Sequence, residues 1–294
     1  IASRELGVPC ISGSLTTYIP FNFSEGGWYK GFIPKLSYHF SNDMFNSNIA
    51  VMSYDREAGS VAGAPTLIGV KKGKNTFRQS ILGSVRGYTM LGTPNSAVYP
   101  KWGIGAEAGA TGSFESSSIL SPVGYAYLYG YTPGILDSHG TKLTAMYQQK
   151  LSKEAFFGQT AVDFLPRGFS SNSALLNSLA YRSAWMSKIT ADYACPIYIG
   201  DIGIIGGFFY IKRLVVSPHF DYTFLPDGKG LYSYGTALTL DLNSILWLGW
   251  PVSVGITGSI NGGTGSYHNL NAAREELGVN MDRWFIGPTF NVSF

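Results

Sequence analysis

The last eleven residues of the chain, "WFIGPTFNVSF" (284–294), alternate strictly between two kinds of side chain. One face carries the apolar residues Trp284, Ile286, Pro288, Phe290, Val292 and Phe294. The other face is small and polar after Phe285. A side-chain period of two predicts a β-strand with one apolar and one polar face. The length suits a tilted membrane-crossing strand, which needs roughly 9–11 residues, but an edge strand of a soluble sandwich alternates in the same way.

The same alternation recurs throughout the sequence and predicts about twelve strands. The clear segments are 14–23, 31–40, 102–114, 123–131, 185–197, 213–224, 232–242, 250–260 and 284–294, and the weaker ones are 48–55, 77–89 and 141–151. We expect one short helix, at 271–277, and we interpret the tyrosine stripe at 125–131 as packing at a lipid interface. The fold class is therefore all-β.

Composition favours a membrane β-barrel over a soluble protein. Only 13% of residues are charged, whereas a soluble domain averages about 25%. The longest apolar run, at 204–211, is too short for a membrane-spanning helix, which needs about 18 residues. A net charge of +3 is too small to indicate nucleic-acid binding. Cys10 and Cys195 are too far apart in sequence to indicate a disulfide framework or a metal site.

Short and long connections alternate between the predicted strands. Counted back from the final strand, they are long, short, medium, short and then very long, at 152–184. Short turns at one end and long loops at the other are typical of an outer-membrane antiparallel barrel, and a soluble sandwich gives no reason for them. We therefore expect a transmembrane β-barrel over 1–294, with Trp284 and Phe294 near the two membrane interfaces.

The longest loop contains "FLPRGFSSN" (164–172), in which Arg167 stands between a proline and a glycine. In one interpretation this is an ordinary surface turn. In the other, Asp192 and Asp221, which lie on the polar faces of the next two strands, point into the lumen and hold the guanidinium. Such a pair would fix the position of the loop more than it would stabilise the fold.

These segments resemble the bacterial surface antigen superfamily, which contains outer-membrane protein insertases and two-partner-secretion translocators. That family carries a Val-Arg-Gly-Phe/Tyr motif at the tip of an inward-folded loop, with five strands after it. Here "PRGF" precedes five predicted strands, "ADYACPI" is similar to the Glu-Tyr-x-x-Pro strand, and "HFDYT" is similar to the aromatic-x-Asp-x-Gly strand. The resemblance implies that Pro166, Arg167, Gly168 and Phe169 form the loop tip. It also implies that Asp192 and Asp221 are the lumenal partners of Arg167.

The chain departs from the family pattern at three positions and indicates a divergent branch. Pro166 replaces Val, His219 replaces the aromatic residue, and Thr223 replaces Gly. A second match, "VRGY" at 85–88, has too many strands after it and is interpreted as coincidence.

The family barrel has sixteen strands, eleven of them before the motif, whereas seven are predicted before it here. The resemblance therefore implies that four strands, and any periplasmic domain, precede this sequence. A closed barrel of twelve strands is the competing explanation.

The resemblance implies a protein of the Gram-negative outer membrane that inserts, assembles or translocates other outer-membrane proteins, gated by the Arg167 loop. The seam would lie between the first and last strands. Its residues on the closing strand would be Trp284, Gly287, Pro288, Phe290 and Phe294. The expected partners are outer-membrane lipids, unfolded or transported outer-membrane proteins, and periplasmic or surface accessory subunits.

The alternatives are a channel, or an accessory or structural barrel subunit of a larger outer-membrane complex. The candidate lumenal charges form a mixed set with no repeated ring of one sign, so they do not predict a strongly selective pore. They are Glu107, Lys142, Lys188, Asp192, Arg213, His219 and Asp221. We expect no enzymatic activity, no cofactor, no metal and no nucleic acid. A Ser–His pair in "GSYHN" (265–269) lies in a loop, where alternate residues hardly share a face.

Overall fold

The fold was analysed in a computed structural model of the chain. The structure describes residues 12–41, 48–53, 66–72, 78–94, 96–114, 120–152, 157–158, 163–169, 175–176, 179, 183–204, 209–245, 252–279 and 281–292.

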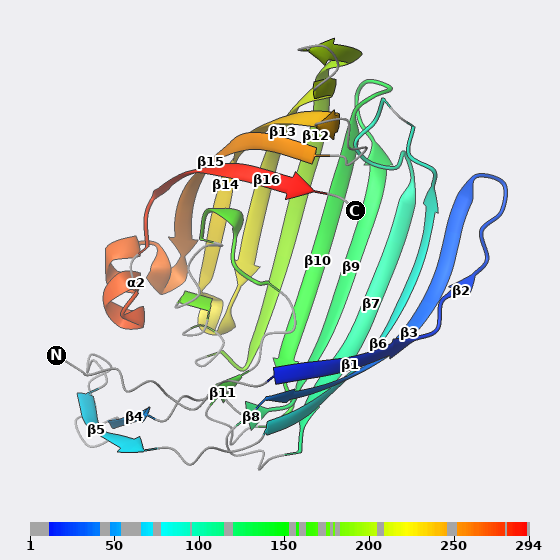
Figure 1. Cartoon of the computed structure of the whole chain (residues 1–294). Helices are drawn as coiled ribbons and strands as arrows, with labels where there is room; N and C mark the ends of the chain where they lie inside the picture. The colour runs from blue at the N-terminus through cyan, green and yellow to red at the C-terminus, as the bar shows by residue number, and fades with distance from the viewer. Residues whose placement is uncertain are drawn as a thin grey trace.

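The described residues form one large antiparallel sheet with two small two-stranded pieces. The strands of the large sheet, in spatial order, are β1 (Ser12–Tyr18), β3 (Trp28–Ser41), β6 (Arg78–Leu91), β7 (Gly103–Ser113), β9 (Val123–Pro133), β10 (Gly140–Lys150), β12 (Trp185–Ile204), β13 (Phe209–Phe224), β14 (Gly230–Ile245), β15 (Val252–Thr264) and β16 (Trp284–Val292). Figure 1 shows this sheet strongly curled, with β1 and β16 as the two ends of the described pairing. The expected all-β fold is confirmed at this level.

Large apolar side chains lie exposed on the outward face of the sheet. On β16 the expected apolar face is the outward one, and Ile286 is 80% exposed while Gly287 is buried. The neighbouring strands repeat this pattern. Examples from six strands are Leu36, Val85, Ile104, Leu143, Leu238 and Ile256. Because strand side chains alternate, the polar residues between them face the concave side.

The tyrosine stripe of β9 faces the concave side, so the expectation of lipid-interface packing was wrong. Tyr129 is only 4% exposed, whereas Leu128, next to it in sequence, is 47% exposed. The physical reason lies in the paired strand β7. A Cβ atom added at Gly105 would lie 2.2 Å from the ring of Tyr129, so the glycine leaves the space into which the ring packs. The alternation predicts that the residues share a face, but the small residues of the neighbouring strand decide which face it is.

Two segments differ from the expected strands. Residues 48–53 form β4 (Asn48–Ser53), which among the described residues pairs with β5 (Thr66–Lys72) in a separate two-stranded sheet. The segment predicted at 14–23 divides into β1 and β2 (Phe21–Asn22). Pro20, which has no N–H for a ladder bond, lies at the break. The second small piece consists of β8 (Leu120–Ser121) and β11 (Phe157–Gly158).

Successive connections lie at opposite ends of the sheet because the strands are antiparallel. At one end, called here the short-turn end, the chain passes from β6 to β7, from β9 to β10, from β12 to β13 and from β14 to β15. At the other end, the long-loop end, it passes from β10 to β12 and from β15 to β16. The long-loop end also carries "LPDGKGL", where a medium connection was expected. This segment is a tight turn through η2 (Pro226–Gly228), in which Asp227 and Gly228 have positive φ angles of 62° and 68°.

The expected helix is α2 (Leu270–Leu277), and its ends follow common capping rules. The Asn269 side chain accepts a hydrogen bond from the Asn271 backbone N–H, and Gly278 ends the helix in the left-handed conformation. Ala273 and Leu277 are buried in a hydrophobic cluster that also contains Phe164, Leu165 and Phe169. The helix therefore belongs to the same hydrophobic cluster as the loop that carries Arg167. None of the described helices is both long and apolar enough to span a membrane.

Candidate functional site

The candidate site is the segment 163–169, here called the Arg167 segment, which follows β10 in the chain and precedes β12. Its last three residues form the short 3-10 helix η1 (Arg167–Phe169). Phe164, Leu165 and Pro166 are fully buried, so the segment lies inside the molecule and not on its surface. Its partners, described below, come from the polar faces of β12, β13, β14 and β15. The interpretation of "PRGF" as an ordinary surface turn is therefore wrong.

Arg167 binds two aspartates from adjacent strands. Its backbone N–H and its Nε donate to Asp221 Oδ2 at 2.8 and 2.9 Å, and its Nη2 donates to Asp221 Oδ1 at 2.8 Å. Its Nη1 lies 2.5 Å from Asp192 Oδ1. Asp221 is 0% exposed. The structure thus brings together the three residues that the sequence associated, and Asp221 makes most of the contacts.

The electrostatics of Arg167 favour a permanently charged guanidinium. Burial by itself would lower the pKa of Arg167. The hydrogen bonds to Asp221 and the negative charge of Asp192 outweigh this effect and raise the pKa above its ordinary value. A guanidinium held by two carboxylates from different strands is fixed in both direction and depth. The arrangement acts as a positional lock, because a desolvated ion pair adds little net stability.

Gly168 allows the backbone to pass close to β15. A Cβ atom at this position would lie 1.7 Å from Asn261 Oδ1, so no larger residue fits without displacement. Asn261 Nδ2 donates to Gly168 O at 3.0 Å and to Asp282 O at 2.9 Å, and Gly168 N–H donates to Ser233 Oγ at 3.2 Å. Ser233 and Asn261 were not identified from the sequence. Ser233 lies on the polar face of a predicted strand and Asn261 directly follows another, and many residues share such positions.

Two further side chains bind backbone carbonyls of the Arg167 segment. Lys188 Nζ donates to Leu165 O at 2.5 Å, and Thr223 Oγ1 donates to Phe164 O at 2.5 Å. Thr223 is one of the departures from the family pattern, and its hydroxyl supplies a contact that glycine lacks. His219, a second departure, lies next to Ser259 with Nε2 and Oγ 3.1 Å apart. The third departure, Pro166, is buried, and its carbonyl accepts from Phe169 N–H at 2.8 Å.

The predicted seam residues lie on β16, except for Phe294, which is outside the described residues. Trp284 and Phe290 are exposed on the outward face. Pro288 pairs with Ile256 of β15, and Gly287 pairs with Thr257. Asn261 N–H donates to Arg283 O at 2.8 Å, so Asn261 and Arg283 form a hydrogen-bonded pair. Hydrogen-bonded pairs alternate with non-hydrogen-bonded pairs along an antiparallel ladder, so Gly287, four residues after Arg283, also belongs to a hydrogen-bonded pair. Pro288 is at a position where the nitrogen points away from β15, so its missing N–H lies on the free edge of β16.

Two other predicted lumenal charges, Glu107 and Lys142, lie on β7 and β10. Arg86, in "VRGY", lies on β6, where its Nη2 donates to Tyr129 OH at 3.0 Å. Glu107 accepts from Tyr125 OH at 2.8 Å. Lys142 is opposite Asp192 in the pairing of β10 with β12. Among the described residues, no three His, Cys, Asp or Glu side chains gather as a metal site would require.

Comparison with known proteins does not assign the chain, because no family model and no curated protein matches it.

Proposed function

We propose that this chain is an outer-membrane β-barrel that inserts, assembles or translocates other outer-membrane proteins, and that the Arg167 segment is its movable gate. The observation that carries the proposal is the position of Arg167. It is bound to Asp192 and Asp221 on the concave side of a sheet whose outward face is apolar. The family resemblance of "PRGF" and its two aspartates gives this geometry its functional meaning.

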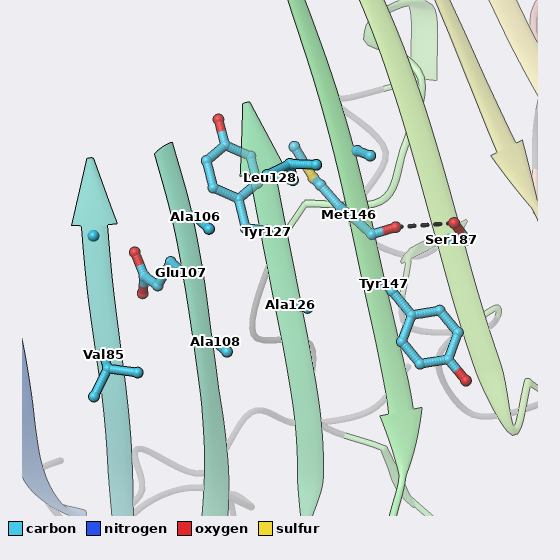
Figure 2. Close-up of a pocket in the computed structure, with 12 residues that line it drawn as sticks. Val85, Ala106, Glu107, Ala108, Ala126, Tyr127, Leu128, Met146, Tyr147 and Ser187 are labelled. Carbon is cyan, nitrogen blue, oxygen red and sulfur yellow. Dashed lines mark hydrogen bonds between the residues drawn. The ribbon is translucent and has the colours of Figure 1, made fainter. Parts of the chain in front are cut away.

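The outward face supports a membrane environment. Contact of the exposed Ile, Leu, Phe and Trp side chains with water is unfavourable in free energy, whereas contact with lipid chains is favourable. A hollow of about 540 Å³ lies on the wall formed by β6, β7, β9, β10 and β12, and Figure 2 shows the residues that line it. Ala106, Ala108 and Ala126 contribute to its lining. The hydroxyl of Ser187 at its margin donates to Met146 O at 3.0 Å, which meets the requirement that polar groups in lipid have internal partners.

The contacts of the Arg167 segment suit a gate. Side chains on four strands hold it by polar bonds. Its release breaks side-chain contacts but no bond of the sheet. The segment can therefore leave the interior while the wall remains intact.

A strand edge with a missing donor supports lateral opening, which the resemblance implies. A second strand that pairs with the free edge of β16 cannot receive a hydrogen bond from Pro288. Pairing across that edge is therefore weakened at one position, while the pairing of β15 with β16 is unaffected.

Quantitative proteomics of the outer membrane after depletion of the protein tests the proposal. A broad fall in unrelated barrel proteins is the result expected of a general insertase, and a fall in one class is expected of a dedicated translocator. Complementation with Arg167→Ala should restore the levels of these barrel proteins less fully than complementation with the wild type. An unchanged outer membrane would reject the proposal and leave the channel or accessory-subunit alternatives.

A further inference from the structure

The connection between β6 and β7 also folds inward, at the short-turn end. Residues 96–101, called here the strap, extend from this connection toward β13, although β9, β10 and β12 lie between β7 and β13 in the sheet. Arg213 Nη1, on β13, donates to Ala97 O at 2.6 Å, and Ala97 is 3% exposed. The strap thus connects two parts of the curled sheet that are distant in strand order.

The anchor of the strap is itself fixed by neighbouring strands. Arg213 Nε lies 2.5 Å from Asp241 Oδ2 on β14, and Ser253 Oγ on β15 donates to Asp241 Oδ1 at 2.7 Å. Three strands therefore hold the far contact of the strap. On its near side, Lys101 Nζ lies 3.6 Å from Oδ1 of the fully exposed Asp137, and such an exposed ion pair adds little to the attachment.

Tyr99 connects the strap to the concave wall formed by β9 and β10. Its ring centroid lies 5.8 Å from that of Tyr131, and a Cβ atom at Gly140 would lie 3.2 Å from Tyr99 Cβ. Burial and the negative charge of Asp192 raise the pKa of Tyr99, and the positive charge of Arg167 opposes them. The strap thus packs on this wall at the short-turn end.

We infer that the strap is a second closure of the interior, in series with the Arg167 segment. The strap closes the short-turn end of the interior, and the Arg167 segment closes the long-loop end. This inference rests on the proposed function, because a closure has a role only if a substrate or ions cross the interior. Release of one closure leaves the other in place. A large increase in passage therefore requires release of both.

A reversible cross-link tests the strap in a single protein. The 3.2 Å separation at Tyr99 and Gly140 is close to the Cβ–Cβ distance of a disulfide, about 3.5–4.5 Å. Tyr99→Cys and Gly140→Cys are introduced into the full chain with Cys10→Ser, Cys195→Ser and Arg213→Ala, with and without Arg167→Ala. Oxidation ties the strap to β10, and reduction frees a strap that has lost both its tyrosine and its bond to Arg213. The single-cysteine variants control for effects of the oxidant.

Ionic current through planar bilayers is the readout. We expect a low current from both forms with Arg167 present, and from the oxidised form with Arg167→Ala. Reduction of the Arg167→Ala protein should raise its current several-fold. If oxidised and reduced forms conduct equally well in the Arg167→Ala protein, the strap is no closure, although the proposed gate stands. If reduction opens the protein fully with Arg167 in place, the strap alone closes the interior and the Arg167 gate is wrong. If no form conducts, both ideas are rejected.

Discussion

At the scale of single residues, the two aspartates that bind Arg167 are not equivalent. Asp221 is fully buried and accepts three hydrogen bonds from Arg167, whereas Asp192 accepts the contact from Nη1 alone. We expect Asp221→Ala to destabilise the fold by about 3–5 kcal/mol, because it leaves a charge in the interior without its main partner. Asp192→Ala should lower the free energy of unfolding by about 1.5–3 kcal/mol. Urea unfolding in detergent, with mass spectrometry of protease cuts in 163–169, compares them. Equal effects would contradict the assignment of Asp221 as the main partner.

Gly168 provides a second test at the same scale. We expect Gly168→Ala to destabilise the fold by about 1–3 kcal/mol, because the added methyl group overlaps Asn261. In an Asn261→Ala background the same change should cost less, and a double-mutant cycle measures the difference. Gly112→Ala is the matched control, since an added Cβ there meets nothing within 4 Å. Additive effects of the two substitutions would show that the close approach is not what requires glycine.

At the scale of elements, the proline in β16 is placed where it spares the existing ladder. We expect Pro288→Ala to leave the unfolding free energy within about 0.5 kcal/mol, because its nitrogen faces the free edge. Thr289→Pro, one residue later, removes a donor that faces β15 and should cost about 1–3 kcal/mol. Hydrogen exchange of the β15 amides, together with urea unfolding, distinguishes the two variants. A large loss of protection in Pro288→Ala would contradict the pairing derived for β16.

The strands show what sequence reasoning can and cannot determine. Period-two alternation located β12 to β16 and placed Asp192, His219 and Asp221 on inward faces, because the pleat fixes which residues share a face. It failed for the tyrosines of β9, whose inward direction depends on glycines of β7, a neighbour that the alternation does not identify. It also joined 48–55 to the large sheet, because the sequence of a strand does not name its partner. The contacts of Asn261, Ser233 and Arg213 depend on the curl of the whole sheet, and the polar faces of the strands do not identify the partners of these residues.

At the scale of the whole molecule, the account depends on the opposite character of the two faces. The outward face carries exposed Ile, Leu, Phe and Trp, whereas the inward face carries the buried Asp221, Lys188 and His219 with their partners. A soluble protein has the reverse distribution, since charged side chains gain most from contact with water. The proposed gate and strap both depend on this contrast between the faces. Each closes a polar interior, and the wall around that interior has an apolar outward face that suits lipid.

The measurement that tests this claim most directly is the effect of an arginine on the outward face. Ile256 is exposed on β15 and pairs with Leu238 near the middle of β14. The free energy of folding into phospholipid vesicles is compared for the wild type and Ile256→Arg by urea titration. If lipid surrounds this face, the substitution should cost about 2–4 kcal/mol, as it does near the middle of a bilayer. A change within about 0.5 kcal/mol, which is usual for a water-exposed strand, would contradict the account.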